Sequence, residues 1–291
     1  IDTALASPEM VRVGDGDEGL FSTREYLKAE AALDRAVASL AKQSGFSVGV
    51  GHRKVASAAK DKALCRRYGN GLSYEQRGAI EHVLGPGQIA SVVGLAGAGK
   101  STLLATAHDA WQRQRVNVHG AALSGKAADG LEASSGIKSR TLAALELAWA
   151  NGYEPVSRGE VLVIDEAGMV GTRQMKRIAE KMQEIGAKLV LVGDPDQLQP
   201  IEAGTPFRRI VEAHGAARLT EIHRQSEDWQ KLATKDLAAG RISDAIERYS
   251  QNDAVRRETS QEMATARLVQ DYLADLSENT ETASCLAFAH R

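Results

Sequence analysis

The sequence predicts an α/β protein whose core is a parallel sheet with helices on both faces. Four short apolar runs have the character of buried strands, and helix-like segments separate them. Near-continuous apolar strands that alternate with helices are typical of parallel sheets covered on both sides. Each motif described below directly follows one of the strands, where ligands of such sheets bind. The four strands are expected at residues 89–93, 116–123, 161–164 and 189–192.

The composition is that of a globular protein without an overall attraction for polyanions. The chain has 291 residues, of which 43% are hydrophobic and 25% charged, and its formal net charge is −2. Any nucleic-acid site must therefore be a local groove. Two cysteines, Cys65 and Cys285, form no disulfide framework, which favours a reducing, cytoplasmic setting. No apolar run approaches the length of a membrane span, and we expect no membrane segment.

Two helices are expected before residue 70. Ser22 and Glu25 have capping-box spacing, and the apolar spacing that follows predicts a helix over residues 26–42. A second helix is expected over residues 54–68, which hold five lysine and arginine residues. We interpret this charge as a solvated face, with a DNA contact as the alternative. Asn70-Gly71 is a turn signal, so a domain boundary is expected there.

From residue 70, strand-like apolar runs alternate with helix-like segments, and after Gly215 the sequence is mainly helix-like. Further helices are expected at residues 73–84, 102–114 and 141–150. One more strand is expected at 217–222, followed by long helices within 227–276 and a last apolar run at 285–289. We therefore expect an accessory segment over residues 1–69, the main lobe over 70–214 and a third part over 215–291. Because the chain begins with Ile1 and ends just after an apolar run, we expect a piece of a longer polypeptide.

The segment between the first strand and the next helix fits the P-loop pattern GxxxxGKS in full. Its glycines let successive backbone N–H groups point at phosphate oxygens, and the helix that follows adds its positive N-terminal end. Lys100 is expected to neutralise the β- and γ-phosphates of ATP, and Ser101 to bind Mg²⁺. An ordinary glycine-rich turn is the alternative, but the flanking strand and helix favour the P-loop. The nucleotide-binding residues expected here are Gly94, Ala96, Gly97, Ala98, Gly99, Lys100, Ser101 and Thr102.

Two carboxylates, Asp165 and Glu166, end the strand at residues 161–164. Burying carboxylates at the edge of a sheet costs free energy unless a cation or a donor pairs with them. With a P-loop upstream, Asp165 is expected in the Mg²⁺ shell and Glu166 is expected to orient and deprotonate the attacking water. A surface turn at the end of a strand is the alternative interpretation.

Two further polar residues follow later strands. Gln197 lies in Gly193-Asp194-Pro195-Asp196-Gln197-Leu198, where it could hydrogen-bond a γ-phosphate and report its loss. Asp194-Pro195 alone would indicate only a turn. Arg224 follows the apolar run near residue 219, and an arginine near a γ-phosphate stabilises transition-state charge. A surface ion pair is the alternative role for Arg224.

Taken in order, these motifs resemble those of superfamily 1 helicases, and the RecD-like branch looks most similar. The resemblance is carried by residues 94–102, 165–168, 193–198 and the pair Arg224-Gln225. Residues 122–128 resemble the DNA-contacting loop of that branch, and 139–142 resemble its next DNA-touching motif. Residues 4–9 and 21–25 resemble the linker before the helicase part of TraA-type conjugative relaxases of Ti-like plasmids.

The resemblance implies a RecA-like lobe that binds ATP and Mg²⁺, followed by the incomplete start of a second such lobe. It implies that Gln76 reads adenine, although Ser73 and Gln76 also have capping-box spacing. Ser124, Gly125, Lys126 and Thr141 would contact the backbone of single-stranded DNA, with a loop and a helix cap as their structural alternatives.

The expected function is ATP-driven translocation on single-stranded DNA, with strand separation during conjugative transfer in the intact protein. That protein would continue into a relaxase domain and a second helicase lobe. The alternatives are a stand-alone RecD-type repair helicase and a nucleotide-dependent DNA-binding module with negligible turnover. Because the family completes its site with an arginine from the second lobe, we expect these 291 residues alone to hydrolyse ATP slowly.

Overall fold

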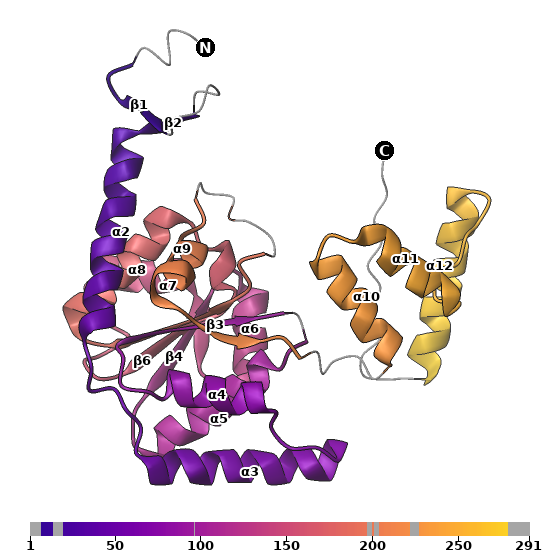
Figure 1. Cartoon of the computed structure of the whole chain (residues 1–291), viewed down its shortest axis with the longest axis horizontal. Coiled ribbons are helices and arrows are strands. Elements are labelled where there is room, and N and C mark those ends of the chain that lie inside the picture. The colour runs from indigo at the N-terminus through magenta and orange to yellow at the C-terminus, as the bar shows by residue number, and fades with distance from the viewer. Residues whose placement is uncertain are drawn as a thin grey trace. The chain divides into compact units, whose positions relative to one another are not determined.

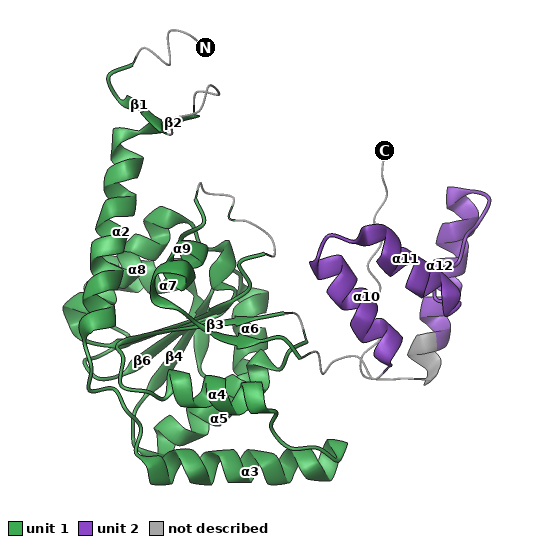
Figure 2. Ribbon diagram, viewed as in Figure 1, with its two compact units in different colours: residues 1–224 green, residues 225–291 purple. Residues whose placement is uncertain are grey.

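The computed structural model of the chain describes residues 7–13, 20–95, 97–196, 200, 204–221 and 227–278, with side chains as far as residue 274. The chain divides into two compact units, Ile1–Arg224 and Gln225–Arg291 (Figure 2). No helix in the described ranges is both long and apolar enough to cross a bilayer.

The first unit is built on a six-stranded sheet in the order β5-β4-β6-β7-β3-β8, and every pair of neighbours is parallel (Figure 1). The parallel α/β fold expected from the sequence is confirmed. The three-residue strand β5 was not expected, since it is too short to show a period. The strands are β3 (Ile89–Gly94), β4 (Val118–Ala122), β5 (Ser139–Thr141), β6 (Val161–Ile164), β7 (Lys188–Gly193) and β8 (Ala217–Leu219).

Successive residues of the central strands enter two different hydrophobic cores. Val161 and Val163 of β6 belong to one core, while Leu162 and Ile164 belong to the other. This is why the run is continuously apolar: both faces of the strand are buried, as in parallel sheets generally. The first core includes residues of α3 (Val50–Tyr68), α4 (Tyr74–Val83), α5 (Lys100–Arg113) and α6 (Gly125–Ser135). The second includes α2 (Arg24–Lys42), α7 (Leu142–Ala150), α8 (Thr172–Ile185) and α9 (Pro206–His214).

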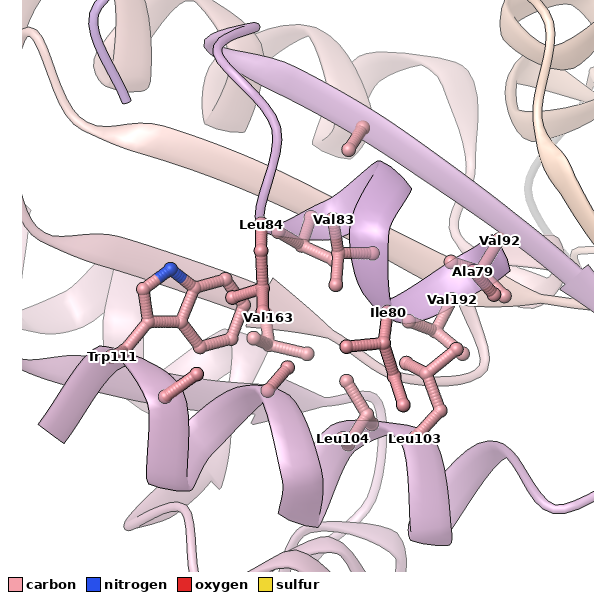
Figure 3. Close-up of a cluster of buried hydrophobic side chains, with 14 of the residues drawn as sticks. Ala79, Ile80, Val83, Leu84, Val92, Leu103, Leu104, Trp111, Val163 and Val192 are labelled. Carbon is pink, nitrogen blue, oxygen red and sulfur yellow. The ribbon is translucent and has the colours of Figure 1, made fainter. Parts of the chain in front are cut away.

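The first core fixes the helix that follows the P-loop. Leu103 and Leu104 of α5 point toward Ile80 and Val83 of α4 and toward strand residues such as Val192 (Figure 3). Leu103 and Ile80 are fully buried. Burying such side chains contributes about 1.5–3 kcal/mol each, so α5 and its N-terminus are held firmly against the sheet.

The N-terminal elements belong to the same unit as the sheet. Strands β1 (Met10–Val13) and β2 (Leu20–Thr23) form an antiparallel pair that leads into α2. The N-cap of α2 is Thr23, whose side chain accepts from Tyr26 N, so the expected cap at Ser22 is wrong by one residue. Leu33 and Val37 of α2 lie in the second core, and α2 packs along α8. No compact unit ends at the boundary expected near residue 70.

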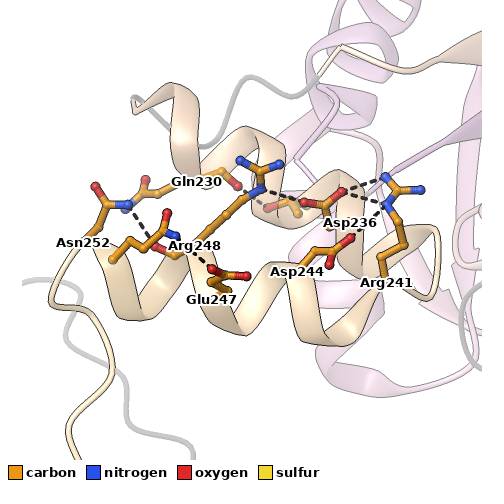
Figure 4. Close-up of polar contacts among 9 residues, drawn as sticks. Gln230, Asp236, Arg241, Asp244, Glu247, Arg248 and Asn252 are labelled. Carbon is orange, nitrogen blue, oxygen red and sulfur yellow. Dashed lines mark hydrogen bonds and ion pairs between the residues drawn. The ribbon is translucent and has the colours of Figure 1, made fainter.

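The second unit is helical over its described residues. It contains α10 (Asp228–Ala238), α11 (Ile242–Gln251) and α12 (Gln261–Glu278). Asp236 of α10 accepts from Arg241 and Arg248, and this ion-pair cluster joins α10 to α11 (Figure 4). The division falls after Arg224 and not at residue 214, because β8 pairs with β3 inside the main sheet. The apolar run expected at 285–289 lies outside the described residues.

Candidate nucleotide-binding and catalytic site

The P-loop connects β3 to α5 at the carboxyl edge of the sheet. Gly94 ends β3 and Lys100 begins α5. Gly97 and Gly99 have φ angles of 80° and 84°, a left-handed conformation that glycine adopts without strain. The loop therefore curls in front of the N-terminus of α5, where free N–H groups and the helix dipole favour an anion. Ala98 is buried, and Ala96 lies outside the described residues.

Lys100 folds back over this loop. Its Nζ donates to the carbonyl oxygens of Gly94 at 2.6 Å and Leu95 at 3.4 Å. A Cβ on Gly94 would lie 3.1 Å from Lys100 Cγ and 3.2 Å from Leu219 Cβ. Glycine at position 94 thus leaves room for the lysine stem between β3 and β8. This places the ammonium group at the mouth of the P-loop.

The acidic pair follows β6 on the same edge. Asp165 accepts from Glu166 N at 3.0 Å through Oδ1. Burial raises the pKa of Asp165, while the Glu166 N–H and the charge of Lys100 oppose the rise. Glu166 has a φ of 55° and an exposed side chain, and it precedes a single 3₁₀ turn, η1 (Ala167–Met169). Asp165 therefore faces inward toward the lysine, while Glu166 is directed to solvent by an unusual backbone conformation.

The donor set suits Mg²⁺. This ion prefers hard oxygen ligands and keeps several waters, so one or two protein oxygens together with phosphate suffice. Ser101 follows Lys100 at the start of α5, and the desolvated carboxylate of Asp165 is stabilised by a cation. Among the described residues no group of three or more His, Cys, Asp or Glu could hold a metal alone. These donors fit a metal that enters together with a nucleotide.

The loop after β7 packs directly against the acidic turn. A Cβ on Gly168 would lie 2.4 Å from the carbonyl oxygen of Asp194, and one on Gly193 would lie 2.9 Å from Gly168 N. Only glycines allow this backbone contact between the two motifs. Asp194 is buried, and its Oδ1 accepts from Asp196 N at 3.0 Å. Gln197 lies outside the described residues.

Arg208 of α9 holds the start of that loop and could not be found from the sequence. Its Nη2 donates to Pro195 O at 2.8 Å and to Asp196 Oδ1 at 3.1 Å. The partners are 12 and 13 residues apart in sequence, and no motif links them. A lone arginine on an amphipathic helix carries no signal of this role.

Gln76 and its neighbour Glu75 tie α4 to the end of β8. Gln76 Oε1 accepts from Ser73 N, and Ser73 Oγ accepts from Gln76 N, so the expected capping box is present. Glu75 accepts from Thr220 N at 2.5 Å and from Glu221 N at 3.0 Å, a link that the sequence did not suggest. The side chain of Gln76 is thus fixed beside the carboxyl edge. Arg224 lies outside the described residues.

The candidate DNA-contacting residues lie at the other end of the sheet. Ser124 caps α6 by accepting from Ala127 N, and Thr141 caps α7 by accepting from Ala144 N, so the structural alternatives for both are present. Ala122 of β4 pairs with Thr141 of β5, which brings the two helix N-termini side by side. Gly125 and Lys126 begin α6, and both are exposed.

Together the fold and the site define a P-loop nucleotide-binding protein with a parallel sheet. The chain belongs to the AAA domain family, whose model matches residues 71–260.

Similar proteins support the narrower resemblance seen in the motifs. The conjugal transfer protein TraA of Rhizobium radiobacter is 43% identical over 93% of this chain and 24% of its own length. The ATP-dependent RecD2 DNA helicase of Deinococcus radiodurans is 30% identical over 57% of this chain and 24% of its own length. The chain spans about a quarter of the length of these relatives. The resemblance to TraA-type and RecD-like proteins is confirmed.

Among solved structures, the Pif1 helicase from Bacteroides in complex with ADP-AlF3 and ssDNA is similar. The identity is 19% and the TM-score is 0.45, over 72% of this chain and 57% of that chain.

Proposed function

We propose that this chain is the ATP-hydrolysing part of a DNA helicase that translocates on single-stranded DNA and separates duplex strands during conjugative transfer. The observation that carries the proposal is the order of the motif loops along one sheet edge. The P-loop, the loop after β7 and the acidic turn leave the neighbouring strands β3, β7 and β6. Similarity to TraA over most of the chain supports the conjugative setting.

In this proposal each residue of the edge has a separate task. Lys100 leaves the Gly94 and Leu95 carbonyls to neutralise the β- and γ-phosphates, because a charged acceptor is stronger than a neutral one. Ser101 and Asp165 hold Mg²⁺, which when bound neutralises charge that develops on the phosphates. Glu166, exposed at the edge, orients the attacking water and accepts its proton. Gln76 contacts adenine, and Gln197 and Arg224 contact the γ-phosphate.

The single strand is proposed to cross the N-termini of α6 and α7. Backbone N–H groups at a helix N-terminus favour phosphate oxygens, and Lys126 adds a full charge there. The Ser124 and Thr141 hydroxyls already accept cap hydrogen bonds, which leaves each hydroxyl proton available to donate to a phosphate. These contacts recognise no base, so binding is expected to be indifferent to sequence.

ATP turnover tests the proposal when it is measured in the full-length protein, with and without single-stranded DNA. We expect DNA to stimulate hydrolysis. Turnover that is negligible under both conditions would instead favour a nucleotide-dependent binding module. In the cellular setting, Lys100→Ala in the full-length reading frame should abolish plasmid transfer, while Lys176→Ala, on the distant helix α8, should not.

A stand-alone repair helicase is the second candidate, and the 30% identity to RecD2 favours it. The same Lys100→Ala strain distinguishes the two roles. Loss of plasmid transfer with unchanged survival after DNA damage supports the conjugative role, and the reverse result supports repair.

A further inference from the structure

Helix α3 carries a concentration of positive charge that the site described above does not use. Residues Val50–Tyr68 contain six lysine and arginine residues and one acidic residue, in a chain with 36 basic and 38 acidic residues. The helix lies on the outside of the first core, where Ala56 is its one buried residue. Apart from α3, the chain is therefore clearly acidic, and the helix forms a local basic surface.

Most of these cations have no acidic partner among the residues that the structure describes. Arg53 pairs with Glu81 and Asp61 with Arg77, both on α4. Across the described part of the chain, no ion pair or hydrogen bond involves the side chains of Lys54, Lys60, Lys62, Arg66 and Arg67.

Helix α8 of the same unit shows the opposite arrangement. Its basic residues Arg173, Lys176, Arg177 and Lys181 pair with Glu25, Glu180, Glu146 and Glu154 in turn. Among the described residues, the four basic side chains of α8 named here have acidic partners, whereas Arg53 alone of the six on α3 has one. The contrast indicates a surface that meets an external anion.

Three of the unpaired cations lie on the outer face of the helix, whereas Lys60 and Arg67 lie on the side of Ala56. Lys54, Lys62 and Arg66 are separated by eight and four residues, so they lie along one row, about 12 and 6 Å apart by the rise of a helix. Ala56 lies on the opposite side of the helix. Like charges four residues apart, as at Lys62 and Arg66, destabilise an isolated helix by about 0.2–0.5 kcal/mol. Such a row does not serve stability, but it fits a chain of phosphates.

An aromatic side chain ends the helix but lies off this row, because the two residues from Arg66 to Tyr68 turn about 200° around the helix axis. Tyr68 is 63% exposed, and the guanidinium of Arg67 lies 5.2 Å from the centre of its ring. Asp61, late in α3, accepts from Leu72 N just before α4, and α4 begins beside Thr220. The C-terminus of α3 is therefore directed toward the carboxyl edge of the sheet.

We propose that the outer face of α3 is a second contact surface for single-stranded DNA. Lys54, Lys62 and Arg66 bind successive stretches of the phosphate backbone, and a base stacks on Tyr68 where the strand passes around the C-terminal end of the helix. The inference rests on the proposed function, since it assumes that the protein works on a single strand. It is distinct from the candidate site at Lys126, because α6 follows β4 near one end of the sheet, while α3 packs on α5, which follows β3.

The first test is the triple variant Lys54→Gln, Lys62→Gln, Arg66→Gln. Binding to a fluorescent oligothymidylate is measured by anisotropy over a range of salt concentrations. Three lost phosphate contacts should weaken binding and flatten the slope of log K against log salt by about 2, since each contact on a single strand contributes about 0.7. The control, Lys176→Gln, Arg177→Gln, Lys181→Gln, removes the same charge from α8 and should leave the slope unchanged.

The second test separates stacking from charge. Tyr68→Leu should weaken binding to oligothymidylate at least about fivefold, because stacking on one base contributes about 1–3 kcal/mol. It should leave binding to an abasic strand of equal length unchanged, whereas the triple variant should weaken both. Parental affinity of Tyr68→Leu for both the oligothymidylate and the abasic strand would show that no base stacks on Tyr68.

The outcomes also separate this inference from the proposed function. A triple variant with the parental slope overturns the α3 surface, even if DNA still stimulates ATP turnover. If the triple variant showed a flatter salt slope for duplex DNA and the parental slope for single-stranded DNA, the α3 surface would be a duplex contact and the inference would be wrong. If DNA does not stimulate ATP turnover but the salt slope of the triple variant is flatter as expected, the translocation proposal is wrong and the α3 contact surface is supported. Equal thermal midpoints by circular dichroism exclude misfolding of the variants.

Discussion

The contact between Gly168 and Gly193 holds the two acidic loops of the candidate site together. Gly168→Ala places a Cβ 2.4 Å from the Asp194 carbonyl oxygen, which is backbone and cannot swing away. We expect a loss of about 1–3 kcal/mol in the free energy of unfolding, as for overpacking elsewhere. The matched control is Gly130→Ala in α6, where a Cβ meets nothing within 4 Å. That change should stabilise the helix by about 0.5–1 kcal/mol. Equal unfolding midpoints in denaturant for both variants would contradict the argument.

At Lys100 we expect Lys100→Ala to weaken binding of ATP–Mg²⁺ at least about tenfold, since a hydrogen bond to a charged group contributes about 1.5–3 kcal/mol. The fold should persist, because the Lys100 ammonium donates to loop carbonyls and belongs to neither hydrophobic core. Calorimetric titration with ATP–Mg²⁺ measures the effect, and Lys126→Ala serves as the charge-matched control. Parental affinity in Lys100→Ala would mean that the loop does not hold the phosphates.

At Glu166 we expect Glu166→Gln to bind ATP as the parent does and to hydrolyse it at least about 100-fold more slowly. The side chain is exposed, and its described neighbours do not depend on its charge, so the substitution should leave the turn in place. The comparison is best made in the full-length protein with single-stranded DNA present. Turnover at the parental rate would assign proton transfer to another group.

Prediction of the site from sequence was uneven for a physical reason. Lys100, Asp165 and Glu166 lie in local motifs, where chemistry requires fixed spacing, and they could be named directly. Arg208 and Glu75 act on backbone groups that are remote in sequence, so only the folded chain brings the partners together. Gln76 was assigned two roles, of which the capping box is present and the adenine contact stays a proposal.

Among the elements, strand β7 carries a fully buried lysine at its start. Lys188 Nζ donates to Gly85 O at 2.8 Å. Burial lowers the pKa of Lys188 to about 7 from 10.5, and the charge of Arg53 adds to the decrease. Burial also lowers the pKa of neighbouring His82, with a smaller effect from Lys188. The folded chain therefore gives up the Lys188 proton far more readily than the unfolded chain does.

We expect the free energy of unfolding to rise with pH between about 7 and 10.5, because only the unfolded state binds the Lys188 proton there. The slope contributed by Lys188 should approach about 1.4 kcal/mol per pH unit at most. Urea unfolding of the parent and of Lys188→Met across this window measures it. As pH rises, the free energy of unfolding of the parent should increase relative to that of Lys188→Met. If the difference in free energy of unfolding between the parent and Lys188→Met stayed constant across this pH window, Lys188 would not be the group that titrates.

Element prediction succeeded where periodicity is long and failed where it is short. The runs of β3, β6 and β7 are apolar on both faces, so they could be recognised as buried strands. β5 has three residues, and its Ser139-Arg140-Thr141 sequence contains no apolar residue. It joins the sheet by pairing with β4, as the last strand at that end. The N-cap of α2 is Thr23, one residue after the expected Ser22, because serine and threonine are equally suited to cap a helix. Strand β2, which extends to Thr23, decides between the two positions.

For the whole molecule, the net charge of −2 makes any DNA affinity a local property. Binding to single-stranded DNA should be weak, should fall steeply with salt and should be indifferent to sequence, because phosphate contacts release counterions. Lys126→Ala should weaken it uniformly across sequences and lower the salt slope by about 0.7. Anisotropy with several oligonucleotides at fixed salt tests this. A strong preference for one sequence would require base contacts that these residues do not provide.

Domain boundaries were the least predictable feature of the whole molecule. Asn70 and Gly71 lie in the connection between α3 and α4, but α2 and α3 contribute to the two cores of the sheet, so no unit ends there. Likewise, β8 extends the sheet beyond the expected end at residue 214. Local signals mark turns, whereas a domain boundary depends on contacts that reach across the chain.

The position of β3 between β7 and β8 has a consequence for how the protein is made. β3 ends at Gly94, and its two partners begin at Lys188 and Ala217. On a ribosome that adds about 5–20 residues per second, both edges of the P-loop strand would stay unpaired for about 5–20 s. During that interval an apolar strand with two open edges can pair with another nascent chain. Slower translation between these strands, or the absence of chaperones, should therefore lower the yield of native protein.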